Sequence, residues 1–373
     1  MKRRQRTNSK TSVKNPFDRS FFYLILTMVT LGLVFVADIS TPQALSFFND
    51  KFYFFRQQVT WAIIGLAAMI VVSNIHYSFW KKLAVPFFFA AVLTLIAVLI
   101  PGISLKALGA RRWISIGSIN FQPSEVIKLA LALYLAKVSE SSKKPLAYFI
   151  PLALVCGLIM LQPDLGTTLV VGLIGVTQIY VSGVPIMYFL GTLFAGISSV
   201  AVLILVSPYR RDRLMTFLQV SSDPLGKEYH IRQILLALGS GGLFGLGIGQ
   251  SRQKFLFLPE ASTDSIFAAM AEEIGFIGSL ALISLFAYFI YRAFKIASNA
   301  PDQFSKILAL GITAWIGGQM ILNLSSMTAL TPLTGIPLPF FSYGGTSLSM
   351  ILASCGILLN ISRYANTKTI TRR

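Results

Sequence analysis

Length, composition and charge exclude an ordinary soluble protein: of 373 residues, 54% are hydrophobic and 12% are charged, about half the charged share of a soluble domain. The net charge of +18 indicates loops that face anionic lipid, and no nucleic-acid partner is predicted. Cys156 and Cys355 lie in apolar runs, which argues against a disulfide framework or a thiolate metal site.

The chain begins and ends in basic, polar segments, 1–19 and 363–373. The apolar run after the first segment is followed by no small-residue cleavage site of the kind that ends a signal peptide. We therefore predict two retained tails, one before and one after a membrane domain that covers residues 20–362.

Between the tails, apolar runs recur at the length of a membrane span, which is about 20 residues for about 30 Å of hydrocarbon. We predict an all-α polytopic membrane protein with about ten transmembrane helices. The predicted spans are 20–38, 57–75, 83–101, 123–138, 146–162, 165–183, 186–207, 265–291, 306–327 and 345–362. The gaps after the fifth and sixth spans are so short that the flanking spans must form hairpins.

The distribution of Lys and Arg predicts the orientation. With the N-terminus in the cytoplasm, both tails and the basic loops near Lys81, Lys143 and Arg292 lie on the cytoplasmic side. The other side receives 101–122, a long extracytoplasmic loop over 208–264 between helices 7 and 8, and 328–344. These external segments are expected to hold the chemistry.

The long loop is not a simple linker. It contains amphipathic runs over 210–220 and 229–238 and then the glycine-rich stretch GSGGLFGLGIGQ. Loops this long with periodic segments are usually functional. No internal repeat indicates an inverted-repeat transporter.

Four segments carry a family signal in register: GARRWISIGSINFQPSEVIKLA, LQPDLGTTLV, the stretch over 209–278 that includes LPEASTD, and TGIPLPFFSYGGTSL. In order, spacing and membrane context the chain resembles the SEDS (shape, elongation, division, sporulation) glycosyltransferases. The first loop and the PEASTD wording are more similar to the division type (FtsW) than to the elongation type (RodA). Two positions depart from the family pattern: Ser265 replaces a bulky aromatic residue, which should loosen packing beside Asp264, and His230 replaces Gln.

The resemblance implies an activity, a cofactor and partners. A SEDS enzyme in the cytoplasmic (inner) membrane polymerises lipid II at the outer face, moving glycan from an undecaprenyl-pyrophosphate carrier to a sugar hydroxyl with inversion, for division or cell shape. The family also implies a divalent cation, Mg or Mn, and a class B penicillin-binding protein (transpeptidase) as partner. A lipid II flippase and a non-catalytic scaffold remain alternatives. Charged groups gathered at one membrane face favour an interfacial active site.

Asp264 is the strongest catalytic candidate. It lies where the long loop meets a span, and the resemblance implies that it is the catalytic acidic residue. A carboxylate there can take the proton of an incoming hydroxyl. The alternative is structural, because Asp before an apolar run is a favoured N-cap.

Four further charged residues lie at or inside spans. Helical geometry places Glu272 near the face of Asp264 and Glu273 on the opposite one. Glu272 can support the aspartate or pair with a cation on a neighbouring span. Glu125 and Lys128, spaced i and i+3, can neutralise each other, although the family motif places them near the substrate groove.

Basic residues outside the membrane run against the orientation rule and so call for an external anion. A pyrophosphate fits, because guanidinium groups bind its oxygens bidentately; lipid headgroups are the alternative. Trp113 is either an interfacial anchor or part of the groove. The predicted substrate-binding cations are Arg111, Arg112, Arg210, Arg213 and Lys254.

Overall fold

The computed structural model describes residues 16–102, 104–107, 110–116, 119–141, 144–206, 211, 215 and 229–365. Most of both tails lies outside the described residues, namely 1–15 and 366–373. So do Arg210, Arg213 and the amphipathic run over 210–220 except its residues 211 and 215.

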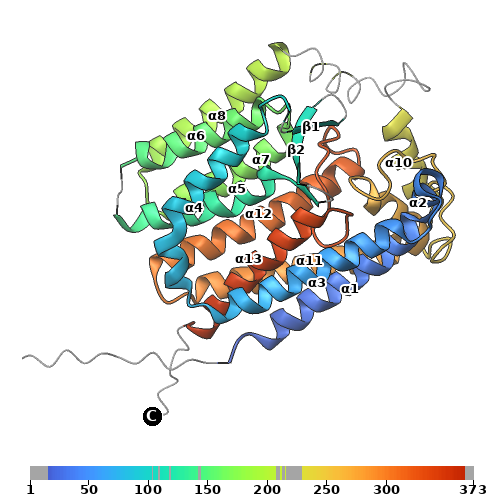
Figure 1. Ribbon diagram of the computed structural model, residues 1–373, viewed down its shortest axis with the longest axis horizontal. Coiled ribbons are helices and arrows are strands. Elements are labelled where there is room, and N and C mark those ends of the chain that lie inside the picture. Colours follow the sequence, from blue (N-terminus) through green and yellow to red (C-terminus); the bar gives the residue numbers. More distant parts are fainter. Residues whose placement is uncertain are drawn as a thin grey trace, which may run out of the picture.

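Each of the predicted spans corresponds to one helix, and the predicted all-α membrane fold is confirmed. Two helices outside the spans, α2 and α10, lie at one end of the bundle (Figure 1). The helices are α1 (Arg19–Ile39), α2 (Thr41–Phe48), α3 (Tyr53–Asn74), α4 (Tyr77–Ala97), α5 (Pro123–Ser141), α6 (Leu146–Met160), α7 (Leu165–Val181), α8 (Ile186–Val206), α10 (Tyr229–Ser240), α11 (Ile266–Ser298), α12 (Gln303–Met327) and α13 (Gly345–Arg363).

Length and composition identify the membrane-crossing helices. Within the described residues, six helices are long and apolar enough to cross a membrane: α1, α3, α4, α11, α12 and α13. Three shorter apolar helices, α6, α7 and α8, occupy the fifth, sixth and seventh predicted spans. α6 packs on α7 and α7 packs on α8, so both predicted hairpins are confirmed. α5 fills the remaining span and carries two buried charges, Glu125 and Lys128.

α12 is the central helix. It packs against α5, α7 and α11 (Figure 1), and most of its side chains are buried. Buried polar residues of such a helix must be satisfied by neighbouring protein groups. Two such residues, Gln319 and Asn323, lie one turn apart near its C-terminal end and contribute to the site described below.

A small antiparallel sheet of order β1-β2-β3 was not predicted. Its strands are β1 (Ser104–Ala107), β2 (Ala110–Ile116) and β3 (Ile119–Phe121). It covers the end of the bundle where α10 and α2 also lie (Figure 1). β2 carries three of the predicted site residues, Arg111, Arg112 and Trp113.

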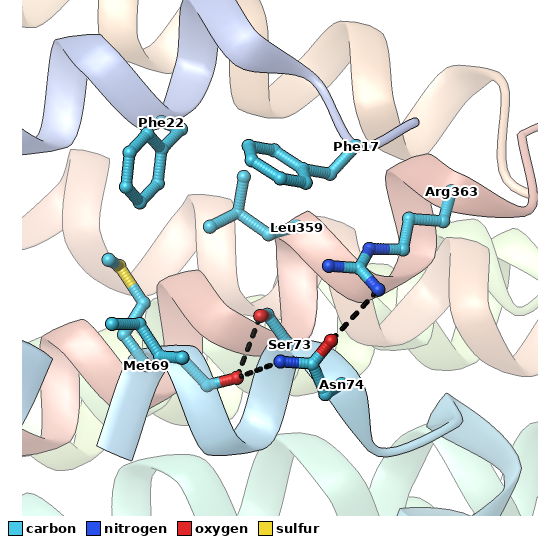
Figure 2. A pocket seen from close by; sticks show the side chains of 8 residues that line it. Phe17, Phe22, Met69, Ser73, Asn74, Leu359 and Arg363 are labelled. Carbon is cyan, nitrogen blue, oxygen red and sulfur yellow. Dashed lines mark hydrogen bonds between the residues drawn. The ribbon is translucent and has the colours of Figure 1, made fainter. Parts of the chain in front are cut away.

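Both chain ends lie at the opposite end of the bundle. Asp18, the N-cap of α1, pairs with Arg292 of α11, and its backbone N–H donates to Ser362 of α13. A cavity of about 200 Å³ at this end is lined by Phe17, Phe22 and Arg363 among others (Figure 2). The prediction that both tails share one side is confirmed for the described chain ends, and their cytoplasmic assignment stays a prediction.

Candidate functional site

Asp264 lies in a turn directly before α11. The N-cap residue of α11 is Ser265, whose side chain makes no capping hydrogen bond. Asp264 is therefore not itself the N-cap residue of this helix, and its catalytic role stays a prediction. Its backbone carbonyl instead accepts a hydrogen bond from Asn323 of α12 at 2.8 Å.

The carboxylate of Asp264 faces an irregular segment, residues 334–344, which we call the strap. A Cβ atom added to Gly335 would lie 3.4 Å from Asp264 Oδ2, and Gly335 has a positive φ of 70°. Glycine is the residue that adopts this conformation without strain and leaves room beside the carboxylate. The strap thus forms one wall of the surroundings of Asp264.

Three buried amide side chains hold the strap. Asn323 Nδ2 donates to the Ile336 carbonyl at 2.8 Å as well as to Asp264, so one amide joins the strap to the candidate catalytic residue. Gln319 Nε2 donates to the Pro337 carbonyl at 3.0 Å. Gln58 of α3 donates to the Ser342 carbonyl and accepts from the Gly344 N–H, each at 3.2 Å.

The turn before α11 also binds the strap directly. Ser342 Oγ donates to the Thr263 carbonyl at 2.6 Å, and the Tyr343 N–H donates to the Ser262 carbonyl at 2.9 Å. Ser262 and Thr263, the two residues before Asp264, are thereby fixed to the strap. The orientation of Asp264 depends on backbone groups that are far away in sequence.

The predicted Glu125–Lys128 ion pair is confirmed, with a distance of 2.7 Å and both side chains buried. Lys128 Nζ also donates to Gln319 Oε1 at 3.0 Å and lies 5.1 Å from the centroid of the Trp315 ring. Through Gln319 the pair connects to the strap. A buried polar network therefore links α5 to the segment beside Asp264, whereas a substrate role for the pair stays a prediction.

Arg112 is held by the loop between α6 and α7. Its guanidinium donates to the carbonyls of Gln162 and Pro163 at 3.2 and 2.5 Å and lies 3.8 Å from Asp164. The acid that balances this arginine thus comes from another segment of the chain. Arg111 and Trp113 are half-buried on the same strand.

Lys254 is buried and pairs with Asp38 of α1 and Glu273 of α11 at 2.8 and 2.9 Å. Burial lowers the pKa of its ammonium, but the hydrogen bonds and charges of the two carboxylates outweigh burial and raise the pKa above its ordinary value. In the described structure Lys254 ties the long loop to two helices, and its predicted role toward substrate stays untested.

The prediction that Glu272 and Glu273 serve opposite faces is wrong. Both accept hydrogen bonds from Ser251, Glu272 from the hydroxyl and Glu273 from the backbone N–H. Asp264 precedes the helix, so helical angles cannot be counted from it, and the long loop wraps around this part of α11 to meet both carboxylates. Glu272 is further bound by the Arg252 and Gln253 N–H groups at 3.2 Å, which makes it an anchor of the loop.

The two departures from the family pattern contact each other. His230 Nε2 and Ser265 Oγ are 2.8 Å apart, and Ser265 is fully buried. The expectation that Ser265 loosens the packing beside Asp264 is therefore wrong, because a side chain from α10 fills the position next to it.

The described residues contain no group of three or more His, Cys, Asp or Glu side chains that could hold a metal ion by themselves. Mg²⁺ often needs only one or two carboxylates when substrate phosphates supply further oxygens. The carboxylate of Asp264 fits that pattern, in which the substrate brings the ion, and the prediction of a divalent cation stays a prediction.

Sequence reasoning did not single out Gln58, Gln319 and Asn323. Each is a polar residue within a predicted span or at its edge, and such residues are expensive in a membrane interior unless they pair. That signal was available in the sequence, although nothing in it showed that all three would meet the strap.

Comparison with known proteins agrees with this fold. The family model described as “Cell cycle protein” (FtsW, RodA, SpoVE) matches residues 18–367. Stage V sporulation protein E of Bacillus subtilis (strain 168) is 41% identical over 364 residues, covering 95% of this chain and 99% of that protein. The “Probable peptidoglycan glycosyltransferase FtsW” of Trichlorobacter lovleyi is 37% identical over 354 residues, covering 93% of each.

Two solved structures share the fold. The Rod shape determining protein RodA of Thermus thermophilus has a TM-score of 0.69 at 29% identity, covering 94% of this chain and 98% of that one. A chain from “Structural coordination of polymerization and crosslinking by a peptidoglycan synthase complex” has a TM-score of 0.77 at 29% identity, covering 93% and 98%.

Proposed function

This chain belongs to the FtsW/RodA/SpoVE family of cell cycle proteins, and from that premise we propose that it is a peptidoglycan glycosyltransferase. Its substrate is lipid II, which it polymerises into glycan strands at the outer face of the cytoplasmic membrane. The similar proteins include one named as a probable enzyme of this kind and one from a peptidoglycan synthase complex.

One observation carries the proposal. Asp264, the strap and the Glu125–Lys128 pair come from distant parts of the sequence, yet buried hydrogen bonds through Asn323 and Gln319 join them. Catalytic groups must be held in place by a surrounding shell that fixes their orientation. A carboxylate at the head of a span with such a shell is suited to act as a general base.

In the proposed reaction the sugar hydroxyl of an incoming lipid II attacks the anomeric carbon of the growing glycan. A new bond forms between that oxygen and carbon while the bond from the carbon to the pyrophosphate oxygen breaks, and the configuration inverts. The hydroxyl proton passes to the Asp264 carboxylate. The bonding electrons leave with the undecaprenyl pyrophosphate.

The cations of β2 are suited to the pyrophosphate. Arg111 and Arg112 lie on one strand at the end of the bundle that carries Asp264, and guanidinium groups stabilise developing negative charge on phosphate oxygens. Arg112 already binds two carbonyls and lies near Asp164, so Arg111 is the better candidate for direct contact.

The remaining parts of the proposal follow from the family. A divalent cation, Mg or Mn, would be brought to Asp264 with the pyrophosphate, and a class B transpeptidase would be the partner. Both termini would be cytoplasmic, which puts Asp264 and the strap outside.

The decisive experiment supplies purified chain in nanodiscs with lipid II, with and without the transpeptidase, and measures glycan polymer by gel. Polymer is the expected product. A parallel assay follows fluorescent lipid II across the bilayer of sealed vesicles. Translocation without polymer would contradict the proposal and indicate a flippase. If neither activity is seen at saturating transpeptidase, the non-catalytic scaffold is the remaining function.

A further inference from the structure

The glycine arm, residues 241–249 (GGLFGLGIG), lies across a break in α11. Gly275 interrupts this helix with φ 69° and ψ −170°. Four backbone hydrogen bonds connect the two segments: Leu246 and Gly247 N–H donate to the Glu272 and Glu273 carbonyls at 3.0 Å, and Phe276 and Ile277 N–H donate to the Gly242 and Leu243 carbonyls at 2.9 and 3.1 Å.

The backbones approach so closely that only glycine fits at the crossing. A Cβ atom at Gly245 would lie 2.0 Å from the Glu273 carbonyl oxygen, and one at Gly275 would lie 2.2 Å from the Gly245 nitrogen. Both glycines also have positive φ, 83° and 69°. The glycines are therefore explained by the contact between the arm and the broken helix.

These backbone hydrogen bonds allow the glycine arm to lie in hydrocarbon. In hydrocarbon an unpaired backbone group costs several kcal/mol, so non-helical backbone is tolerated there only where protein satisfies it. Here the arm and the broken turn of α11 satisfy each other. An irregular segment built in this way can stand next to lipid.

The side chains of the arm point away from the protein. Leu243, Phe244 and Ile248 are 62, 80 and 67% exposed. They extend the exposed apolar surface of α11 formed by Phe276 and Ile277 just past the break, and no charged residue occurs between Gly239 and Gln250. A contiguous group of exposed apolar side chains marks a site of contact with a membrane or another protein.

The length of α11 gives the depth of the break. At the other end of this helix, Tyr288 and Tyr291 are exposed rings of the kind that mark a membrane interface, and Arg292 pairs with Asp18. From Gly275 to Tyr291 the helix rises about 24 Å, which is less than the roughly 30 Å of a hydrocarbon core. The break therefore lies within the hydrocarbon, near the edge at which Asp38, Lys254 and Glu273 restore charge.

We propose that the glycine arm is a shallow re-entrant membrane segment whose Leu243, Phe244 and Ile248 side chains contact the acyl chains of the leaflet on the side of Asp264. It would fix the long loop at the level of the lipid headgroups. The inference depends on the membrane location of the chain and stands whether or not Asp264 is catalytic.

The test places a bimane probe on Phe244→Cys in a background with Cys156→Ala and Cys355→Ala, using the purified full chain in nanodiscs without any partner. The control is Glu260→Cys, at an exposed charged residue beyond the arm. Lipids brominated on the acyl chain should cause a large loss of bimane fluorescence at position 244 and little at 260. A membrane-impermeant maleimide should label 260 quickly and 244 slowly.

Ile248→Cys serves as a second probe if the Phe244 variant fails to fold, because it belongs to the same surface. Equal quenching and equal labelling at the arm and at 260 would overturn the proposal. Arm probes that react freely in nanodiscs and become protected only on addition of the transpeptidase would also overturn it, because the surface would then be a protein interface.

Discussion

The strap at one end of the bundle and the chain termini at the other are held by different kinds of interaction. At the site end, neutral amides of Gln58, Gln319 and Asn323, all fully or almost fully buried, donate to backbone carbonyls of the strap or of Asp264. At the end that carries the chain termini, charged pairs such as Lys81–Glu140 and Asp18–Arg292 lie partly in solvent.

The difference follows from the backbone at each end. The strap is irregular, and its carbonyls need directional donors in a dry interior, where leaving one unpaired costs about 1–3 kcal/mol. Helix ends near water lack that need, and exposed ion pairs contribute only about 0–1 kcal/mol. Substitutions at the two ends should therefore differ in size and in whether they affect activity or only stability.

The largest effect is expected for Asp264→Asn. The substitution keeps the size of the side chain and removes the charge and the proton acceptor, so polymerisation should fall by about 10² to 10⁴-fold if Asp264 is the general base. The backbone carbonyl that Asn323 binds is unchanged, so the fold should persist. Polymer formed from lipid II and the thermal midpoint are measured on the same preparation; a folded variant with near wild-type rate would eliminate Asp264 as the base.

The Glu125–Lys128 pair sharpens the comparison because it is charged yet buried, and Gln319 connects it to the strap at the site end. Removing one partner, as in Glu125→Gln or Lys128→Met, should destabilise by about 3–5 kcal/mol, because the other charge is left buried and unpaired. The double variant should recover much of that stability. Thermal unfolding and polymer assays on all three separate the roles: a stable but inactive double variant indicates a substrate role, and a stable, active one a structural role only.

Asn323 and Gln178 form a matched pair for the next effect. Each is fully buried and donates from its amide nitrogen to two backbone carbonyls, Asn323 to Asp264 and Ile336, Gln178 to Ala132 and Ile307. Replacement of either by Leu should lower stability by a similar amount, about 1–3 kcal/mol for each carbonyl left unpaired.

Activity should distinguish the two variants. Only Asn323→Leu releases the strap from Asp264, so only this variant should lose polymerisation per folded molecule, by roughly tenfold or more for a displacement of about 1 Å. Rates are compared at a temperature at which both variants are folded. Equal activity of the two would mean that the amides at the site end serve stability alone.

Much of the fold was predictable because a membrane imposes a simple rule on the sequence. Apolar runs long enough to cross hydrocarbon predict helices such as α1, α7 and α13 nearly to their ends. The sheet was not predictable, because its strands are short and ARRWISI carries no regular alternation of apolar and polar residues. The break at Gly275 lies within an apolar run and depends on a partner segment.

In the candidate site, too, local features could be predicted and tertiary contacts could not. The Glu125–Lys128 pair could be predicted because its spacing is local to one helix, and Asp264 could be singled out by its position and family motif. The partners of Lys254 and Glu272 could not, because Asp38 and Ser251 reach them through tertiary packing. Long-range hydrogen bonds to backbone carbonyls leave no pattern in a single sequence.

The smallest effect is expected at the terminus end, for Lys81→Gln. Lys81 pairs with Glu140 of α5, but its side chain is 42% exposed, and water and salt screen such a pair. The loss of stability should be about 0–1 kcal/mol, with polymerisation unchanged. Lys82→Gln is the control, since it removes the same charge from the neighbouring, exposed residue.

Thermal unfolding at low and high salt measures both variants: the pair should contribute slightly to stability at low salt and not at high salt. If Lys81→Gln destabilised the chain as strongly as Asn323→Leu while Lys82→Gln did not, charged pairs at the terminus end would be as important as the buried amides, and the contrast between the two ends would be wrong.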